Sequence, residues 1–187
     1  MSNIAIFASH NGTSLDTIYD AIQSNVLNLN IKLIITNNTN ANVLDKATKY
    51  KIPNFVVNDK KYDEVDITLE KLLDQYKCQY IFLAGYMKKI PDNLTKKYKI
   101  INSHPALLPK YGGDGMYGRY VHEAVIKNGE KESGITVHNV TSNYDEGSII
   151  HQRSLKLEDN ETVESLEEKI KKLEQITIIE AFQKIEL

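Results

Sequence analysis

The sequence has few of the features that mark disulfide-rich, membrane-spanning or strongly charged proteins. Its single cysteine, Cys78, can form no internal disulfide, and the apolar run that follows it favours burial over reactivity. No apolar stretch is long enough to cross a bilayer, and no signal-peptide pattern is present. The formal net charge of −2 gives no electrostatic basis for binding nucleic acid or an anionic membrane. We therefore expect a cytoplasmic protein with a small-molecule partner.

Motifs of several common enzyme classes are missing as well. The chain has no G-x-G-x-x-G fingerprint and no P-loop ending in Gly-Lys-Ser/Thr, so dinucleotide and triphosphate binding have little support. It also lacks the G-x-S-x-G motif of serine hydrolases. His104, His122, His138 and His151 show no i, i+4 pairing and no cysteine partner, and we expect no metal site.

What the sequence does contain is a regular alternation of apolar runs and amphipathic stretches. Short apolar runs predict buried strands at residues 3–8, 31–36, 53–57, 79–84 and 99–103. Apolar residues at helical spacing predict helices from residue 15 and over 41–50, 62–76 and 91–98. This order predicts an α/β fold with a doubly wound, mostly parallel, Rossmann-like sheet. Loops that follow the first, fourth and fifth strands should lie at one edge, where such sheets bind ligands.

The C-terminal part of the chain follows a different pattern. A Gly-rich loop at 111–118 leads into a predicted helix over 119–127, and two alternating segments, 133–140 and 148–155, predict antiparallel strands at the sheet edge. A last helix is expected over 162–181. Because no linker interrupts the 187 residues, we expect one domain, 1–187, made of two halves, 1–98 and 99–187.

Two polar residues stand where the fifth predicted strand ends. Asn102 and His104 are two positions apart, so they should point to the same face, and Pro105 ends the sheet pattern. One interpretation is that they only satisfy loop backbone groups. For a functional role, Asp145, in the loop between the last two strands, is the best acidic partner for the imidazole. His138 lies inside a strand pattern, where a structural role is favoured and support for Asp145 is the alternative.

These three residues suggest charge stabilisation and proton transfer. An amide donor and an imidazole beside a carboxylate can stabilise an oxyanion and relay a proton. No serine, cysteine or lysine in this stretch is an obvious nucleophile. The attacking group would then belong to the substrate, and an amine attacking an acyl donor is the simplest reaction that fits.

The loop after the first strand is a second candidate site. Asn11-Gly-Thr-Ser14 precedes a predicted helix, with Ser14 as its expected N-cap, and the helix start offers amides and a positive dipole end to a phosphate. Gly12 would let the backbone approach the anion closely. An ordinary turn with a helix cap explains the same residues.

The motif Asn102-Ser-His-Pro-Ala-Leu-Leu-Pro-Lys-Tyr-Gly-Gly113, with Ser133-Gly-Ile-Thr-Val-His138 and Asp145-Glu-Gly-Ser-Ile-Ile-His-Gln152, closely resembles the folate-dependent formyltransferases. Within that family, the Asn11-Gly-Thr-Ser14 loop and Leu83-Ala-Gly-Tyr-Met87 resemble the members that act in purine biosynthesis. The likeness covers nearly the whole chain.

The resemblance implies a reaction, a cosubstrate and roles for named residues. The amine of glycinamide ribonucleotide would attack the formyl carbon of 10-formyltetrahydrofolate, the cosubstrate, without a metal. Asn102 and protonated His104 would hold the oxyanion, and Asp145 would orient His104 and raise its pKa. The contacts implied for phosphate are Asn11, Gly12, Thr13 and Ser14, those for ribose are Lys171 and Glu174, and those for folate are Met87, Lys88, Ile90, Leu94, Val140, Thr141 and Asp145.

Some positions depart from the family pattern, and other functions stay open. His10 and Ser14 replace a glycine and an asparagine of the usual loop, and Gln175 follows Glu174 where the family often has histidine. The alternative acceptors are an amino sugar, an initiator aminoacyl-tRNA and water. A catalytically silent nucleotide-binding module is the alternative of a different class. We expect a monomer or homodimer.

Overall fold

The computed structural model describes residues 1–185, and the chain divides into two compact units. The first unit is Met1–Ile101, and the second begins at Asn102. The seven strands have the order β3-β2-β1-β4-β5-β6-β7. Strand β5 (Lys99–His104) begins in the first unit and ends in the second. The fold is α/β, with a mostly parallel sheet and an antiparallel C-terminal strand pair, which confirms the expected class.

The first unit is built on four parallel strands. Strand β1 (Ser2–Phe7) lies between β2 (Leu29–Thr36) and β4 (Tyr80–Leu83), and β3 (Asn54–Val56) pairs with β2. Four consecutive side chains of β1, Ile4 to Phe7, have no exposed surface. A strand buried on both faces has no polar alternation, which is why β1 and the fully buried β4 read as short apolar runs.

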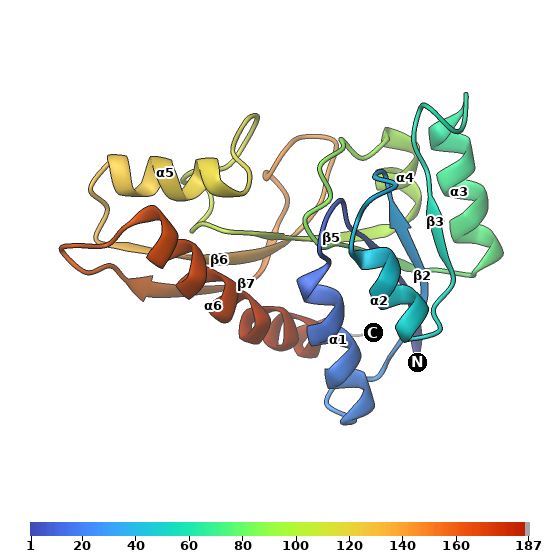
Figure 1. The fold of residues 1–187 in the computed structure, drawn as a ribbon, viewed down its shortest axis with the longest axis horizontal. Helices are drawn as coiled ribbons and strands as arrows, with labels where there is room; N and C mark the ends of the chain where they lie inside the picture. Colours follow the sequence, from blue (N-terminus) through green and yellow to red (C-terminus); the bar gives the residue numbers. More distant parts are fainter. Residues whose placement is uncertain (186–187) are drawn as a thin grey trace. The chain divides into compact units, whose positions relative to one another are not determined.

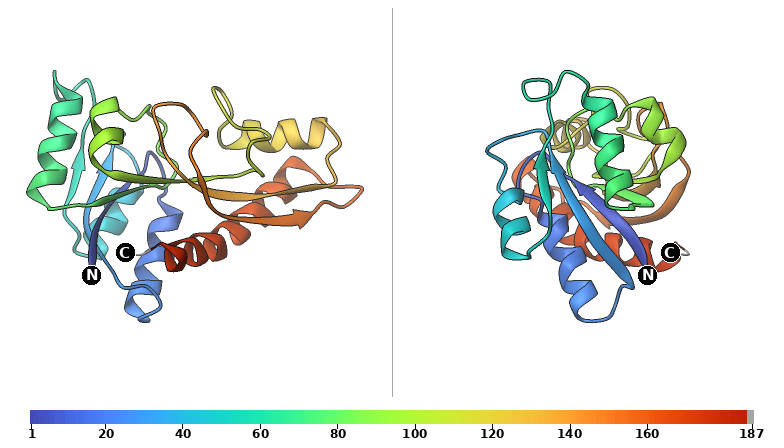
Figure 2. Two further views of the ribbon diagram at one scale, coloured as in Figure 1. Left: turned by 180° about the vertical axis from the view of Figure 1, so that it is seen from behind. Right: turned by 90° about the vertical axis from the view of Figure 1, so that its right-hand side faces the viewer.

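Helices cover both faces of these strands. Helices α1 (Thr13–Gln23) and α2 (Val43–Lys49) lie on one face, and α3 (Val65–Gln75) and α4 (Asp92–Lys97) lie on the other (Figures 1 and 2). Each helix buries an apolar stripe while its remaining side chains face solvent. The inward residues of α1 are Leu15, Ile18 and Ala21, and those of α3 are Leu69, Leu72 and Leu73.

The start of α1 differs from the expectation. Ser14 is not the N-cap, because the helix begins at Thr13 and Ser14 is buried within its first turn. Gly12 occupies the cap position in the left-handed conformation, with φ of 56° and no side-chain cap. A Cβ atom at Gly12 would lie 2.4 Å from Cγ2 of Val43, the first residue of α2. Glycine is therefore required here by backbone conformation and by helix packing.

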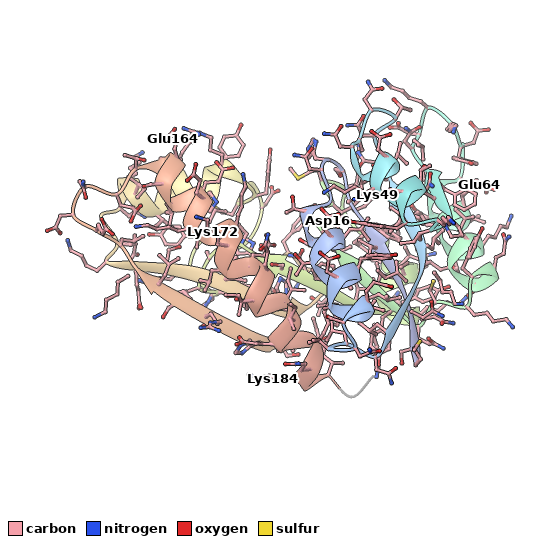
Figure 3. All side chains as sticks on the ribbon, turned by 60° about the horizontal axis from the view of Figure 1, so that its bottom comes forward. Asp16, Lys49, Glu64, Glu164, Lys172 and Lys184 are labelled. Atoms are coloured by element: carbon pink, nitrogen blue, oxygen red, sulfur yellow. The ribbon has the colours of Figure 1, made fainter. Side chains whose placement is uncertain are left out.

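The second unit contains a strand pair and two helices. Strands β6 (Glu132–Asn139) and β7 (Ile149–Lys156) are antiparallel, as expected, and α6 (Val163–Lys184) packs on both of them. Helix α5 (Arg119–Lys127) packs against α6. In Figure 3, Glu164, Lys172 and Lys184 mark the start, middle and end of α6.

Local chemistry fixes where α6 begins. Thr162 accepts a hydrogen bond from the backbone N–H of Ser165, and the Ser165 hydroxyl accepts one from the N–H of Thr162. This reciprocal capping box satisfies amides that the helix leaves unpaired. No helix within residues 1–185 combines the length and apolar character needed to span a membrane.

Candidate active site

Strand β5 positions the first group of polar side chains. Ile100 and Ile101 are buried, and the next residues alternate between the two faces of the strand, as predicted. Asn102 contacts His138, whereas the Ser103 hydroxyl donates to Oε1 of Glu174 on α6 at 2.7 Å. Ser103 is thus held on the opposite face from Asn102.

His104 is buried at the end of β5, with 3 % of its surface exposed. Its Nε2–H donates to the backbone carbonyl of Tyr111 at 2.7 Å, and its Nδ1 lies 3.5 Å from Oδ2 of Asp145. The loop between β6 and β7 therefore brings Asp145 to the imidazole.

Glycines allow this loop to close over the ring. Asp145 has a φ of 55°, and its Oδ2 accepts a hydrogen bond of 3.0 Å from the Gly113 N–H. A Cβ atom at Gly112 would lie 3.1 Å from Cβ of Asp145, and one at Gly147 would lie 1.6 Å from the carbonyl oxygen of Asn139. Side chains at these two positions would hold the carboxylate away from His104.

His138 joins the site more closely than the sequence indicated. Its Nδ1–H donates to the Asn139 carbonyl at 2.9 Å, so in the neutral ring Nε2 is an acceptor. The Asn102 amide nitrogen lies 3.2 Å from this Nε2, and Asp145 Oδ1 lies 3.4 Å from it. His138 thus contacts both other polar partners of the site. Its inward position in an alternating strand next to the Asp145 loop was the available signal.

Burial and charge act on the pKa of His104 in opposite directions. Burial lowers the pKa of His104 below its ordinary value, although Asp145 and the Tyr111 carbonyl act in the opposite direction. Asp145 therefore acts to raise the pKa of His104, as expected, and the lowering comes from burial, which outweighs the carboxylate. Burial also tends to raise the pKa of Asp145, but His138 and His104, when their rings are protonated, and the Gly113 amide outweigh it and lower that pKa. The buried ring therefore holds its proton less tightly than a free imidazole does, and the carboxyl group of Asp145 ionises more readily than a free one.

The loop after β1 is fixed by contacts within the first unit. Buried Ser9 donates to Oδ1 of Asn37 at 2.5 Å and accepts from the Met87 N–H at 2.8 Å, which links the loops after β1, β2 and β4. Asn11 Oδ1 accepts a hydrogen bond of 2.8 Å from Asn42. Thr13, at the first turn of α1, is exposed.

The other expected contacts differ in accessibility. In the first unit, Met87 and Lys88 are exposed, but Ile90 is nearly buried and Leu94 completely so. In the second, Thr141 is exposed and Val140 half-buried. On α6, exposed Lys171 pairs with Glu167 at 2.6 Å, while Glu174 binds Ser103. Among the described residues, no group of three or more His, Cys, Asp or Glu side chains could hold a metal ion.

An α/β sheet with an amide, an imidazole and a carboxylate at the end of β5 defines a protein equipped for acyl-group chemistry. The formyl transferase family matches residues 2–182 of the chain, and the chain belongs to this family.

Named relatives narrow the comparison. The chain is 33 % identical over 179 residues to the phosphoribosylglycinamide formyltransferase of Bacillus subtilis, covering 93 % of this chain and 89 % of the relative. It is 34 % identical over 173 residues to the chloroplastic enzyme of that name from Arabidopsis thaliana, covering 89 % of this chain but only 59 % of the relative. The structure of the phosphoribosylglycinamide formyltransferase of Coxiella burnetii is similar, with 34 % identity, a TM-score of 0.87 and coverage of 97 % of this chain and 85 % of that one.

Proposed function

We propose that the protein transfers the formyl group of 10-formyltetrahydrofolate to the amine of glycinamide ribonucleotide, a step of purine biosynthesis. The observation that carries the proposal is the convergence of Asn102, His104 and Asp145 within the second unit. The named relatives at 33 % and 34 % identity support this choice of acceptor.

The reaction forms one C–N bond and breaks another. The ribonucleotide amine attacks the formyl carbon, the carbonyl oxygen becomes an oxyanion, and the bond from carbon to the folate nitrogen breaks as that nitrogen gains a proton. No protein nucleophile is needed. The serine and the lysine of this stretch are already engaged, because Ser103 is hydrogen-bonded to Glu174 and Lys110 is paired with Glu130 at 3.1 Å.

Three side chains have different roles in this transfer. The Asn102 amide, anchored on His138, donates a hydrogen bond to the oxyanion. His104 takes up the proton of the attacking amine at Nδ1, where the Asp145 carboxylate stabilises the imidazolium. The positive ring stabilises the oxyanion and then supplies the proton, through a water, to the departing folate nitrogen.

Substrate contacts complete the proposal. The phosphate binds at the start of α1, where backbone amides and the helix dipole favour an anion, and the ribose binds at Lys171 and Glu174. For folate we propose direct contact with the accessible side chains and support from the buried ones. The phosphate residues are Asn11, Gly12, Thr13 and Ser14, the accessible folate residues are Met87, Lys88, Val140 and Thr141, and the supporting ones are Ile90 and Leu94.

Acceptor dependence tests the function directly. Purified protein is incubated with 10-formyltetrahydrofolate and glycinamide ribonucleotide, an amino sugar nucleotide, an initiator aminoacyl-tRNA or no acceptor, and tetrahydrofolate release is followed. Release that requires the ribonucleotide is the expected result. Release without an acceptor would identify a hydrolase. Release that requires the amino sugar nucleotide or the aminoacyl-tRNA would overturn the proposed acceptor. No release under any condition would favour a silent nucleotide-binding module.

We also propose that residues 1–187 act as one domain, in the cytoplasm, as a monomer or homodimer. Cell fractionation and light scattering of the purified protein test the last two points.

A further inference from the structure

We propose that Tyr111 is a positioning residue that selects which nitrogen of His104 exchanges protons. This inference rests on the proposed catalytic role of His104. It is carried by contacts at opposite ends of Tyr111, one made by its carbonyl and two by its hydroxyl.

The carbonyl of Tyr111 faces the imidazole. It accepts the Nε2–H of buried His104 at 2.7 Å, which is a short, partly buried hydrogen bond. Tyr111 adopts a φ of 57°, a left-handed conformation that is unfavourable for a residue with a bulky side chain. The surrounding structure must therefore hold this residue in place.

The hydroxyl of Tyr111 supplies that restraint. It donates to Oε1 of Glu130 at 2.8 Å and accepts from the Asn128 amide at 2.9 Å, so both of its hydrogen-bonding functions are used. Glu130 also pairs with Lys110 at 3.1 Å. Asn128 and Glu130 lie at the end of α5 and just beyond it, so the ring is anchored on a regular element.

The anchored carbonyl fixes the tautomer of His104. In the neutral imidazole only one nitrogen carries a proton, and the Tyr111 carbonyl requires it on Nε2. The lone pair is then on Nδ1, 3.5 Å from Asp145 Oδ2. Any proton taken up by the ring must arrive on Nδ1, where the carboxylate stabilises it. The Tyr111 contact thus directs proton uptake to the side of the ring that faces Asp145.

The test measures the tautomer without substrate. Long-range ¹H–¹⁵N spectra report which imidazole nitrogen is protonated, and a His104→Gln variant assigns the signals. In the wild type we expect the Nε2–H form to dominate. In Tyr111→Phe, which removes the anchoring hydroxyl, this form should lose population, kcat should fall about tenfold, and its pH profile should shift.

Matched variants separate positioning from general damage. Tyr117→Phe removes a hydroxyl from an exposed ring in the same loop and should leave the tautomer and kcat unchanged. Glu130→Gln keeps an acceptor for Tyr111 and should behave almost like the wild type, whereas Glu130→Leu should behave like Tyr111→Phe. All variants whose pH profiles are compared keep Asp145, His138 and His122, since these are the other titratable groups near His104.

Two outcomes overturn different claims. If the tautomer and pKa of His104 are the same in Tyr111→Phe as in Tyr117→Phe, the positioning role is wrong even if the enzyme is a formyltransferase. If His104→Gln retains full formyl transfer, the proposed catalytic role of His104 is wrong, whatever the tautomer data show.

Discussion

The hydroxyl of Ser103 donates a 2.7 Å hydrogen bond to Oε1 of Glu174, which ties the C-terminal end of β5 to α6. Burial raises the pKa of this carboxyl group, while Ser103 and Lys171 act to lower it. The chain thus holds an acid at a position where its charged form is disfavoured. A residue kept in such a position is consistent with a ligand contact, as proposed for the ribose.

Glu174→Gln should change how stability depends on pH. Because the folded pKa is raised, the wild-type carboxyl binds protons more tightly in the folded state, and its contribution to stability is lost as pH rises from about 4.5 through the folded pKa. Glutamine keeps the acceptor for Ser103 and carries no charge, so this decline should disappear. Urea unfolding across this pH range, with Glu168→Gln on the exposed face of α6 as control, measures the effect. Parallel profiles for wild type and Glu174→Gln would contradict the raised pKa.

Asn102→Ala should reduce kcat by about 10²- to 10³-fold, because it removes a donor to the oxyanion, and should change the Michaelis constants little. It also leaves Nε2 of buried His138 without its donor, so stability should fall by about 1–3 kcal/mol. Single-turnover kinetics and thermal unfolding separate the two effects.

Asn139→Ala is a suitable control, since its amide donates to Ser148 rather than to a site residue. If Asn102→Ala retains wild-type kcat, Asn102 has no part in oxyanion stabilisation.

Asp145→Asn should lower the pKa of His104 further, because the carboxylate is the largest influence that favours the protonated ring. Proton uptake by the ring would weaken, and kcat should fall with it. NMR titration of His104 in wild type, Asp145→Asn and the exposed loop variant Asp114→Asn gives the comparison. An unchanged or higher pKa in Asp145→Asn would remove Asp145 from its proposed role.

Strand pattern and side-chain alternation were predictable, because they depend on local periodicity. The apolar runs indicated the four parallel strands of the first unit, and period-two alternation separated Asn102 from Ser103. The hairpin of β6 and β7 followed from the same rule.

Contacts that depend on loop closure were not predictable in detail. Asn102 and His138 are 36 residues apart, and their contact depends on how β5 and β6 are placed together with the Asp145 loop. The net pKa of His104 also escaped prediction, because a neighbouring acid is visible in sequence but the extent of burial is not. Ser14 was wrongly expected to cap α1. The helix begins one residue earlier, at Thr13, because Gly12 adopts a left-handed conformation at the cap position.

Gly12→Ala should destabilise the first unit for two reasons that can be separated. The left-handed conformation costs a residue with a Cβ atom about 1–2 kcal/mol. That atom would also meet Val43 Cγ2 at 2.4 Å, and overpacking of this kind costs about 1–3 kcal/mol. In the double variant Gly12→Ala with Val43→Ala, the second part should be recovered, which a double-mutant cycle of urea unfolding measures.

The same pair of variants tests the proposed phosphate site, because a Gly12 substitution alone confuses a steric effect within the protein with an effect on the ligand. We expect the Michaelis constant for the ribonucleotide to stay raised in the double variant, after the helix contact is relieved, and that for the folate to return towards the Val43→Ala value. Equal behaviour of the two constants would mean that Gly12 serves the packing of α1 against α2 and that the phosphate binds elsewhere.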